Sequence, residues 1–519
     1  MEKFINTLDN SVNSNLMTHG TNGQLVYKDV SISSALISFD FKCIRGLETP
    51  KLSEMVSRIL EQEKLETILR HLAFVRDIDK GKGERKVYYQ YLYHIYQKYP
   101  IEITKLIELN IKNFGSWRDI KGLYDISVEY NDIGFQQELF NIIKKQLAID
   151  MNNDKPSMLG KYLPGEKTKY KSMVKQLSKY LFTGNDKMKQ YRKIKSQLTQ
   201  KLNILERNLC SKTRSNIECN KIPALAMKKY KASLFNIGKR NTKKSQEEDN
   251  IIFAQRLKDY LSSQLKEGKG VSSKGIEIRD IVEDIVIEPN YNRELVKAFL
   301  QTIEPKIGDL SKVIPIIDTS GSMYGSNKEI YAALGIGILA SMRSMEPFRN
   351  RFITFSEKPS WFSMEPNDTF EQRVKKATNA PWGYNTNYYA TAELIVSALK
   401  YANVSPEQAC DMTLLVLSDM QFDESDSGDS GASDTVMGNM RRIFGNAGYN
   451  VPTLVFWNLN GTTNGCPINS NEENTVMLSG FNQNMMNMFL NNPSNVNPEG
   501  ILKDVLYSSR YNIVTECIE

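Results

Sequence analysis

An apolar run at residues 313–317 ends in Asp318, which is followed at alternate positions by Ser320 and Ser322. A run of this kind predicts a buried strand of a parallel sheet, and the loop after such a strand lies at the edge where open α/β sheets bind ligands. One carboxylate and two hydroxyls, without His or Cys, suit a hard divalent cation such as Mg²⁺ or Mn²⁺, which keeps waters and an open position. The pattern therefore predicts a metal site that holds a partner rather than one that catalyses a reaction.

A second strand end supplies another carboxylate to the same edge. Residues 413–418 form an apolar run that leads directly into Asp419, and parallel strands of one sheet end on the same side. The segment 382–387, ahead of a predicted helix, offers the hydroxyl of Thr386. Three loops would then surround one cation, with Asp318, Ser320, Ser322, Thr386 and Asp419 as the expected ligands. The alternative is a domain of the same fold that holds no metal.

The elements that must position these residues change character near residue 310. From about residue 52 to residue 300, apolar residues recur at i, i+3, i+4 and i+7, which predicts an all-α, HEAT-like array of packed helix pairs, although no fixed repeat length is visible. Later apolar runs alternate with helical segments, which predicts right-handed crossovers and a doubly wound, Rossmann-like, mostly parallel sheet. The predicted domains are an arm at 1–50, a helical region at 51–305 and an α/β domain at 310–519.

The α/β domain can be divided into elements from the same patterns. Its expected strands are residues 313–318, 351–355, 413–418, 452–458 and 475–478. Its expected helices are residues 328–345, 391–402, 436–444 and 481–490.

Charge divides the chain in the same place. Residues 310–519 hold 14 Lys and Arg against 22 Asp and Glu, so that 53 of the 67 basic and 38 of the 60 acidic residues fall in 1–309.

Basic residues are densest at 187–244, where 17 of them accompany two acids and several aromatic residues. Such a segment can neutralise phosphates by releasing counterions, and aromatic rings can stack on unpaired bases. The candidate RNA contacts are Lys189, Arg192, Lys193, Lys228, Lys229 and Lys231. The alternative is an ordinary solvated helix face.

Cysteine and histidine usage excludes some classes of protein. Six cysteines are scattered without a Cys-x-x-Cys pair and only three histidines occur, so neither a disulfide framework nor a zinc site is expected. The first residues lack the pattern of a secretory signal, and no apolar run approaches membrane-spanning length. We therefore expect an intracellular, cytoplasmic protein.

The predicted ligands resemble those of a known family, the von Willebrand factor type A (VWA) domain with its metal-ion-dependent adhesion site. The triplet that begins at Asp318, the loop residue Thr386 and the strand-end residue Asp419 match its motifs in order. The resemblance implies that Ser320 and Ser322 bind the metal directly, that Thr386 binds it directly or through water, and that the two aspartates balance its charge. It also implies that a carboxylate of a protein partner fills the open position.

A wider resemblance covers most of the chain. A helical region before a VWA-like domain is similar in architecture to the Ro autoantigen, whose TROVE module binds misfolded and small noncoding RNAs. A closer resemblance is to an uncharacterised family of plant, fungal and giant-virus proteins. Its marks are residues 75–85, 115–119, 191–192, 206–207, 418–423, 452–458 and 477–481. This family has no established activity, so the resemblance implies architecture more than function.

These observations favour a noncatalytic protein that binds an acidic protein partner through Mg²⁺ or Mn²⁺ and whose basic helical region binds RNA. One alternative is a structural component of a large assembly such as a virus particle, which would place the protein in the virion. Another is a metal-assisted hydrolase with Asp423 as base, but no histidine follows His94 and no nucleophile–base pair is visible. The glycines of segment 81–85 do not indicate a phosphate loop, because a helix rather than a strand precedes them.

Overall fold

A computed structural model describes most of the chain. The described residues are 16–238, 244–288, 292–325, 328–346, 348–355, 358–380, 387–422, 435–490 and 497–519. The chain divides into two compact units, each built from segments that are distant in sequence. The first contains residues 1–87, 276–291 and 304–516, and the second contains residues 88–275, 292–303 and 517–519. The domain boundaries predicted along the sequence stay a prediction.

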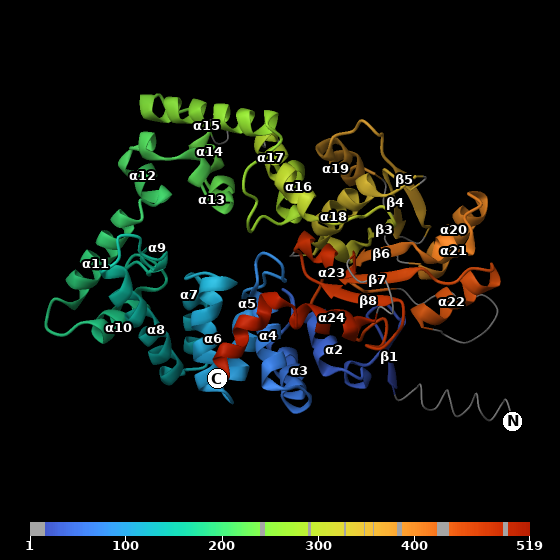
Figure 1. The fold of residues 1–519 in the computed structure, drawn as a ribbon, viewed down its shortest axis with the longest axis horizontal. Coiled ribbons are helices and arrows are strands. Elements are labelled where there is room, and N and C mark those ends of the chain that lie inside the picture. The colour runs from blue at the N-terminus through green and yellow to red at the C-terminus, as the bar shows by residue number, and fades with distance from the viewer. Residues whose placement is uncertain are drawn as a thin grey trace. The chain divides into compact units, whose positions relative to one another are not determined.

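The described residues of the second unit form helices and connecting loops without a strand, which confirms the predicted all-α region (Figure 1). Its α-helices are α5 (Lys86–Tyr96, which begins at the end of the first unit), α6 (Pro100–Asn113), α7 (Asp119–Glu129), α8 (Ile133–Met151), α9 (Leu159–Tyr162), α10 (Lys171–Leu181), α11 (Lys187–Lys201), α12 (Leu205–Ser211), α13 (Ala224–Lys229), α14 (Lys231–Leu234), α15 (Glu248–Lys266) and α17 (Arg293–Ile303). Helix α6 shows why these segments fold this way: a proline stands in its first turn, and its buried positions follow a helical period from Ile103 to Ile111.

The first unit is built on a six-stranded sheet in the order β5-β4-β3-β6-β7-β8 (Figure 1). The strands are β3 (Val313–Asp318), β4 (Arg351–Phe355), β5 (Ser360–Ser363), β6 (Thr413–Ser418), β7 (Thr453–Asn458) and β8 (Thr475–Ser479). All neighbours pair in parallel except β4 and β5. Every strand predicted for the α/β domain is present, and the mostly parallel sheet is confirmed. Strand β5 was not predicted, because four half-exposed residues carry little apolar signal.

Helices of the α/β part follow the prediction at several places. The predicted ones form α18 (Glu329–Arg343), α20 (Tyr388–Tyr401) and α22 (Val436–Asn446), while 481–490 divides into η6 (Gln483–Met486) and α23 (Asn487–Leu490). The structure adds α19 (Phe370–Thr378), α21 (Pro406–Cys410) and α24 (Pro498–Leu506), which the sequence analysis did not predict. Both α19 and α21 begin with a capping box, a local signal that could have revealed them.

Helix α18 lies against the middle of the sheet and is itself covered by α16 (Ile278–Ile287). Two glycines allow this layering, because a side chain at either position would collide with a neighbour. A Cβ atom at Gly337 would lie 2.5 Å from Cδ1 of Ile317 in β3, and one at Gly335 would lie 2.8 Å from Cγ1 of Ile278 in α16. The helix that follows the candidate metal loop is therefore packed tightly on both sides.

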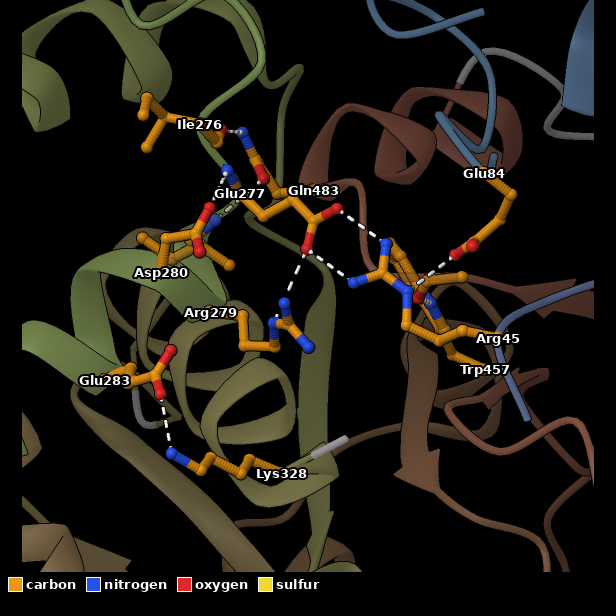
Figure 2. A network of polar contacts seen from close by, with 12 residues as sticks. Arg45, Glu84, Ile276, Glu277, Arg279, Asp280, Glu283, Lys328, Trp457 and Gln483 are labelled. Carbon is orange, nitrogen blue, oxygen red and sulfur yellow. Dashed lines mark hydrogen bonds and ion pairs between the residues drawn. The ribbon is translucent and has the colours of Figure 1, made fainter. Parts of the chain in front are cut away.

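Polar contacts tie α16 to other segments of the first unit (Figure 2). The Arg45 guanidinium donates to Glu84 at 3.0 Å and to Glu277 at 2.8 Å, and it lies over the ring of Phe481 at 4.3 Å. At the other end, Glu283 of α16 accepts from Lys328, the residue before α18, at 2.6 Å. The start of α18 is thereby tied to a segment that stands 45 residues earlier in the chain.

The N-terminal part of the first unit is also integrated with the sheet. It contains β1 (Met17–His19), β2 (Leu25–Tyr27), α2 (Ala35–Lys42), α3 (Thr49–Gln62) and α4 (Leu65–Arg76). Every residue of α2 is buried, and this helix contacts β8.

A fully buried charged cluster joins these elements. Asp40 of α2 accepts from Nζ of Lys82 at 2.7 Å and contacts Nε2 of His71 at 2.9 Å, while Lys82 also donates to Oγ of Ser479 at 2.7 Å. Lys82 is 0% exposed, so the glycine-rich segment 81–85 is a structural connection, as predicted.

Candidate metal centre

Asp318 and Asp419 lie at the carboxyl ends of two neighbouring strands. Asp318 is the last residue of β3, and Asp419 directly follows β6, which pairs with β3 in parallel with Ile317 opposite Leu417. The connections from β3 lead to β4 on one side of the sheet, and those from β6 lead to β7 on the other. The strand order therefore reverses between β3 and β6, and such a switch point is where open α/β sheets bind ligands.

Asp318 is held in one orientation by the loops around it. Its Oδ1 accepts the backbone N–H of Ser320 at 2.9 Å, and its Oδ2 accepts the hydroxyl of Ser418 from the neighbouring strand. The Ser418 hydroxyl oxygen in turn accepts the backbone N–H of Met420 at 2.9 Å. The sequence analysis did not predict a role for Ser418, although its place before a strand-end aspartate could have suggested one.

The two serines of the triplet lie side by side. The residues after Ser320 form a short 3₁₀ helix, η5 (Gly321–Tyr324), which turns the chain back so that Oγ of Ser320 lies 3.0 Å from Oγ of Ser322. The hydroxyl of Ser322 also approaches the Asp419 carboxyl, where it lowers the pKa of that group against the larger effect of burial. The fold therefore brings Asp318, Ser320, Ser322 and Asp419 together, and their role as metal ligands stays a prediction.

One oxygen of Asp419 makes no hydrogen bond to the described residues, although the Ser322 hydroxyl lies near the carboxyl group. Its Oδ1 accepts the backbone N–H of Gln421 at 3.3 Å, but its Oδ2 is buried and unpaired. The next residue, Met420, has a φ of 61°, a left-handed conformation that is unusual for a non-glycine residue. A buried carboxylate oxygen without a donor is costly, and a cation would remove that cost.

The electrostatics of the pair agree with this description. Burial and the negative charge of Asp419 raise the pKa of Asp318 to about 7, and burial raises the pKa of Asp419. Burial is the larger cause for both carboxyl groups, and the charge of Asp419 adds to the shift of Asp318. A divalent cation would supply a positive charge and stabilise the ionised forms.

Thr386, the fifth predicted ligand, lies outside the described residues, as do Trp382 and Asp423. The chain is described again from Asn387, which caps α20 by accepting the backbone N–H of Ala390 at 2.9 Å. Tyr388, the first residue of α20, packs edge-on against Phe355 and Phe422 with ring centroids 4.9 and 5.1 Å apart. This aromatic cluster supports the start of α20 beneath the candidate site.

The donor set suits Mg²⁺ or Mn²⁺. Within the described ranges no group of three or more His, Cys, Asp or Glu side chains has metal-binding geometry. A cation at this edge would therefore rely on two carboxylates and serine hydroxyls, which leaves coordination positions for water or a partner.

The six predicted RNA contacts lie on three helices of the helical unit. Lys189, Arg192 and Lys193 share the exposed side of α11, and the guanidinium of Arg192 lies 3.3 Å from Glu166. Lys228 and Lys229 end α13 and Lys231 begins α14, with Nζ of Lys229 5.0 Å from the centre of the Tyr230 ring.

Comparisons with known proteins cover both halves of the chain. Residues 312–508 match a domain family described as a domain of unknown function, DUF7788, and this span contains the whole sheet and the candidate metal centre. The chain is also 26% identical over 507 residues to an uncharacterised protein of Acanthamoeba polyphaga mimivirus, a match that covers 93% of this chain and 86% of the viral protein. A giant-virus relative was predicted from the sequence and is confirmed. In the part of the chain that the structure describes, no helix is both long and apolar enough to cross a membrane.

Proposed function

We propose that the protein is a noncatalytic binding protein whose α/β domain uses Mg²⁺ or Mn²⁺ to hold a carboxylate of an acidic protein partner. The unpaired, buried Oδ2 of Asp419 carries this proposal, because it lies beside a second carboxylate and two hydroxyls at the switch point of the sheet. A divalent cation would neutralise both aspartates and still have open positions.

The ligand types and the strand order support the same proposal. The Asp-x-Ser-x-Ser loop after β3, at the switch point of the sheet, resembles that of VWA domains, in which the metal bridges the domain and its partner. Of the ligands that this resemblance implies, Ser320 and Ser322 would bind the cation directly, while Asp318 and Asp419 balance its charge. The helical region would correspond to a TROVE-like module.

Calorimetric titration of Mn²⁺ into the full chain tests the metal site. Ser320→Ala with Ser322→Ala removes two hydroxyls and leaves the buried carboxylates in place, while Ser363→Ala removes an exposed hydroxyl from β5 as the matched control. The double variant should bind Mn²⁺ at least about tenfold more weakly, since direct ligands contribute at least as much as outer-shell ones. Equal affinity in the double variant and the control would refute the site.

A pull-down then tests the partner. The wild-type chain should retain an acidic protein in Mg²⁺ and release it in chelator, and the double serine variant should retain none. Equal retention under all three conditions would show that partner binding does not need the metal and would contradict the proposal.

RNA binding by the helical unit is a second candidate function, supported by charge on α11. Lys195, on the other side of this helix, donates to the backbone carbonyl of Leu163 at 2.7 Å. Burial together with the positive charges of Lys195 and Arg118 lowers the pKa of Lys121 to about 8. Cations held this close together favour an anionic ligand such as a phosphate backbone. Filter binding of structured RNA should detect it at low salt, and no binding there would exclude it.

A further inference from the structure

A cavity of about 710 Å³ opens on the first unit and shares no residue with the candidate metal centre. Its walls come from the turn after α4, from η6 and α23, and from α24 with the 3₁₀ helix η7 (Ser509–Cys517) that follows it. Cavities of 300–1,000 Å³ are of the size that small-molecule sites have, so the volume fits a ligand larger than a single ion or a free amino acid.

The walls are held in place by hydrogen bonds that do not depend on a ligand. Asp77, which is 0% exposed, accepts from Nη2 of Arg510 at 2.7 Å, from the Tyr511 hydroxyl at 3.0 Å and from the backbone N–H of Asp79 at 2.9 Å. On another side, Asn487 accepts the backbone N–H of Gly308 at 2.8 Å. The cavity is therefore preformed, which lowers the cost of ordering groups around a ligand.

One wall presents an unpaired acceptor. Asn484 donates through Nδ2 to the backbone carbonyl of Asp79 at 2.9 Å, which orients the amide. Its Oδ1 is buried and has no donor among the described residues. A buried amide oxygen in this state calls for a ligand hydroxyl or N–H group.

Of the charged lining residues, Arg510 is paired with Asp77, whereas three others have no ion-pair partner in the described ranges. Lys80 and Lys306 are exposed, line the cavity and form no ion pair there, and the same holds for Asp504. The two ammonium groups suit an anionic group such as a phosphate, whereas Asp504 and the Asn484 carbonyl both accept hydrogen bonds from hydroxyls. Met488 and Val505 add an apolar wall.

We propose that this cavity binds a small phosphorylated compound with free hydroxyl groups, either a sugar phosphate or a nucleoside phosphate. The phosphate contacts Lys80 and Lys306, and the sugar hydroxyls donate to Asp504 and to the unpaired oxygen of Asn484. A sugar phosphate and a nucleoside phosphate both offer these groups, and only the nucleoside phosphate has a base that can cover the apolar wall.

Calorimetric titration of the full chain in EDTA, which keeps the metal centre out of the measurement, tests the proposal. The probes are AMP, ribose 5-phosphate, ribose and inorganic phosphate. We expect saturable binding of at least one of the first two, and binding at least about tenfold weaker to the Lys80→Met/Lys306→Met variant, since charge-assisted contacts are the strong ones. Both lysines are exposed, so the variant should fold; Lys64→Met, an exposed lysine outside the cavity, is the control.

Tighter binding of AMP than of ribose 5-phosphate would assign a nucleoside phosphate, and equal binding would assign a sugar phosphate. The proposal is overturned if neither compound binds, if inorganic phosphate binds as tightly as both, or if the double lysine variant binds like the control.

Discussion

Replacing Lys82 by methionine should strongly destabilise the first unit. The Lys82 ammonium is 0% exposed and contacts Oδ1 of Asp40 at 2.7 Å and the hydroxyl of Ser479 at 2.7 Å, with a further hydrogen bond to the backbone carbonyl of Asp40. Methionine keeps most of the apolar stem but removes the charge and all three hydrogen bonds. Asp40 then remains as a buried carboxylate with His71 as its side-chain partner.

Breaking a buried ion pair by removing one partner costs about 3–5 kcal/mol of the free energy of unfolding. Because the first unit holds more than 300 residues and its unfolding entropy is about 2.1 cal/mol/K per residue, about 1 kcal/mol shifts the melting temperature by about 1.5 °C, and the expected fall is about 5–8 °C. Scanning calorimetry and urea denaturation of the full chain measure both quantities. Lys80→Met, two residues away on the surface, should change stability by less than about 0.5 kcal/mol.

A double-mutant cycle with Asp40→Asn separates the ion pair from general packing. Once Lys82 is absent, removing the negative charge of Asp40 should recover part of the loss, so that the two effects are not additive by about 1 kcal/mol or more. A loss below about 1 kcal/mol in Lys82→Met, or strict additivity in the cycle, would refute the assignment of this cluster as a buried anchor.

Three further outcomes are expected. In metal-free buffer Asp419→Asn should raise the melting temperature, because it removes one of two buried like charges. The same substitution should abolish the stabilisation that Mg²⁺ gives the wild type, which is about 2.7 kcal/mol at a hundredfold excess over Kd. A lower melting temperature of the variant without metal would contradict the geometry. Burial lowers the pKa of His71, so on acidification the unfolded chain binds a proton at a higher pH than the folded chain, and the free energy of unfolding should fall as the pH drops below about 6.5. Denaturation over a pH series should show a shallower fall in His71→Asn than in the wild type. Identical slopes in the two proteins would contradict this role of His71. Neutralising Lys189, Arg192 and Lys193 of α11 should reduce the salt dependence of RNA binding by about 3 in log–log slope, and neutralising the three lysines of α13 and α14 tests the other group in the same assay. An unchanged slope in both variants would show that neither group contacts phosphate.

Periodicity along the chain was enough to predict the helical region, the strands of the parallel sheet and the carboxyl-end position of Asp318 and Asp419. These features depend on neighbours within a few residues, so their spacing is visible in a linear sequence. The same locality explains the omissions, since β5 is too short and too polar to show alternation.

Other features depended on residues that meet only when the chain folds. The Ser418 bond to Asp318 joins positions 100 residues apart, and the bond from Ser479 to the Asp40 carbonyl joins positions 439 apart. Neither the burial of Lys82 nor the unpaired oxygens of Asp419 and Asn484 follows from a residue type, because each depends on which donors the packed chain leaves within reach. Local patterns could predict strand ends and ligand types, whereas the long-range packing of α2, α16 and the sheet decides which polar groups are paired and which are left to bind something else.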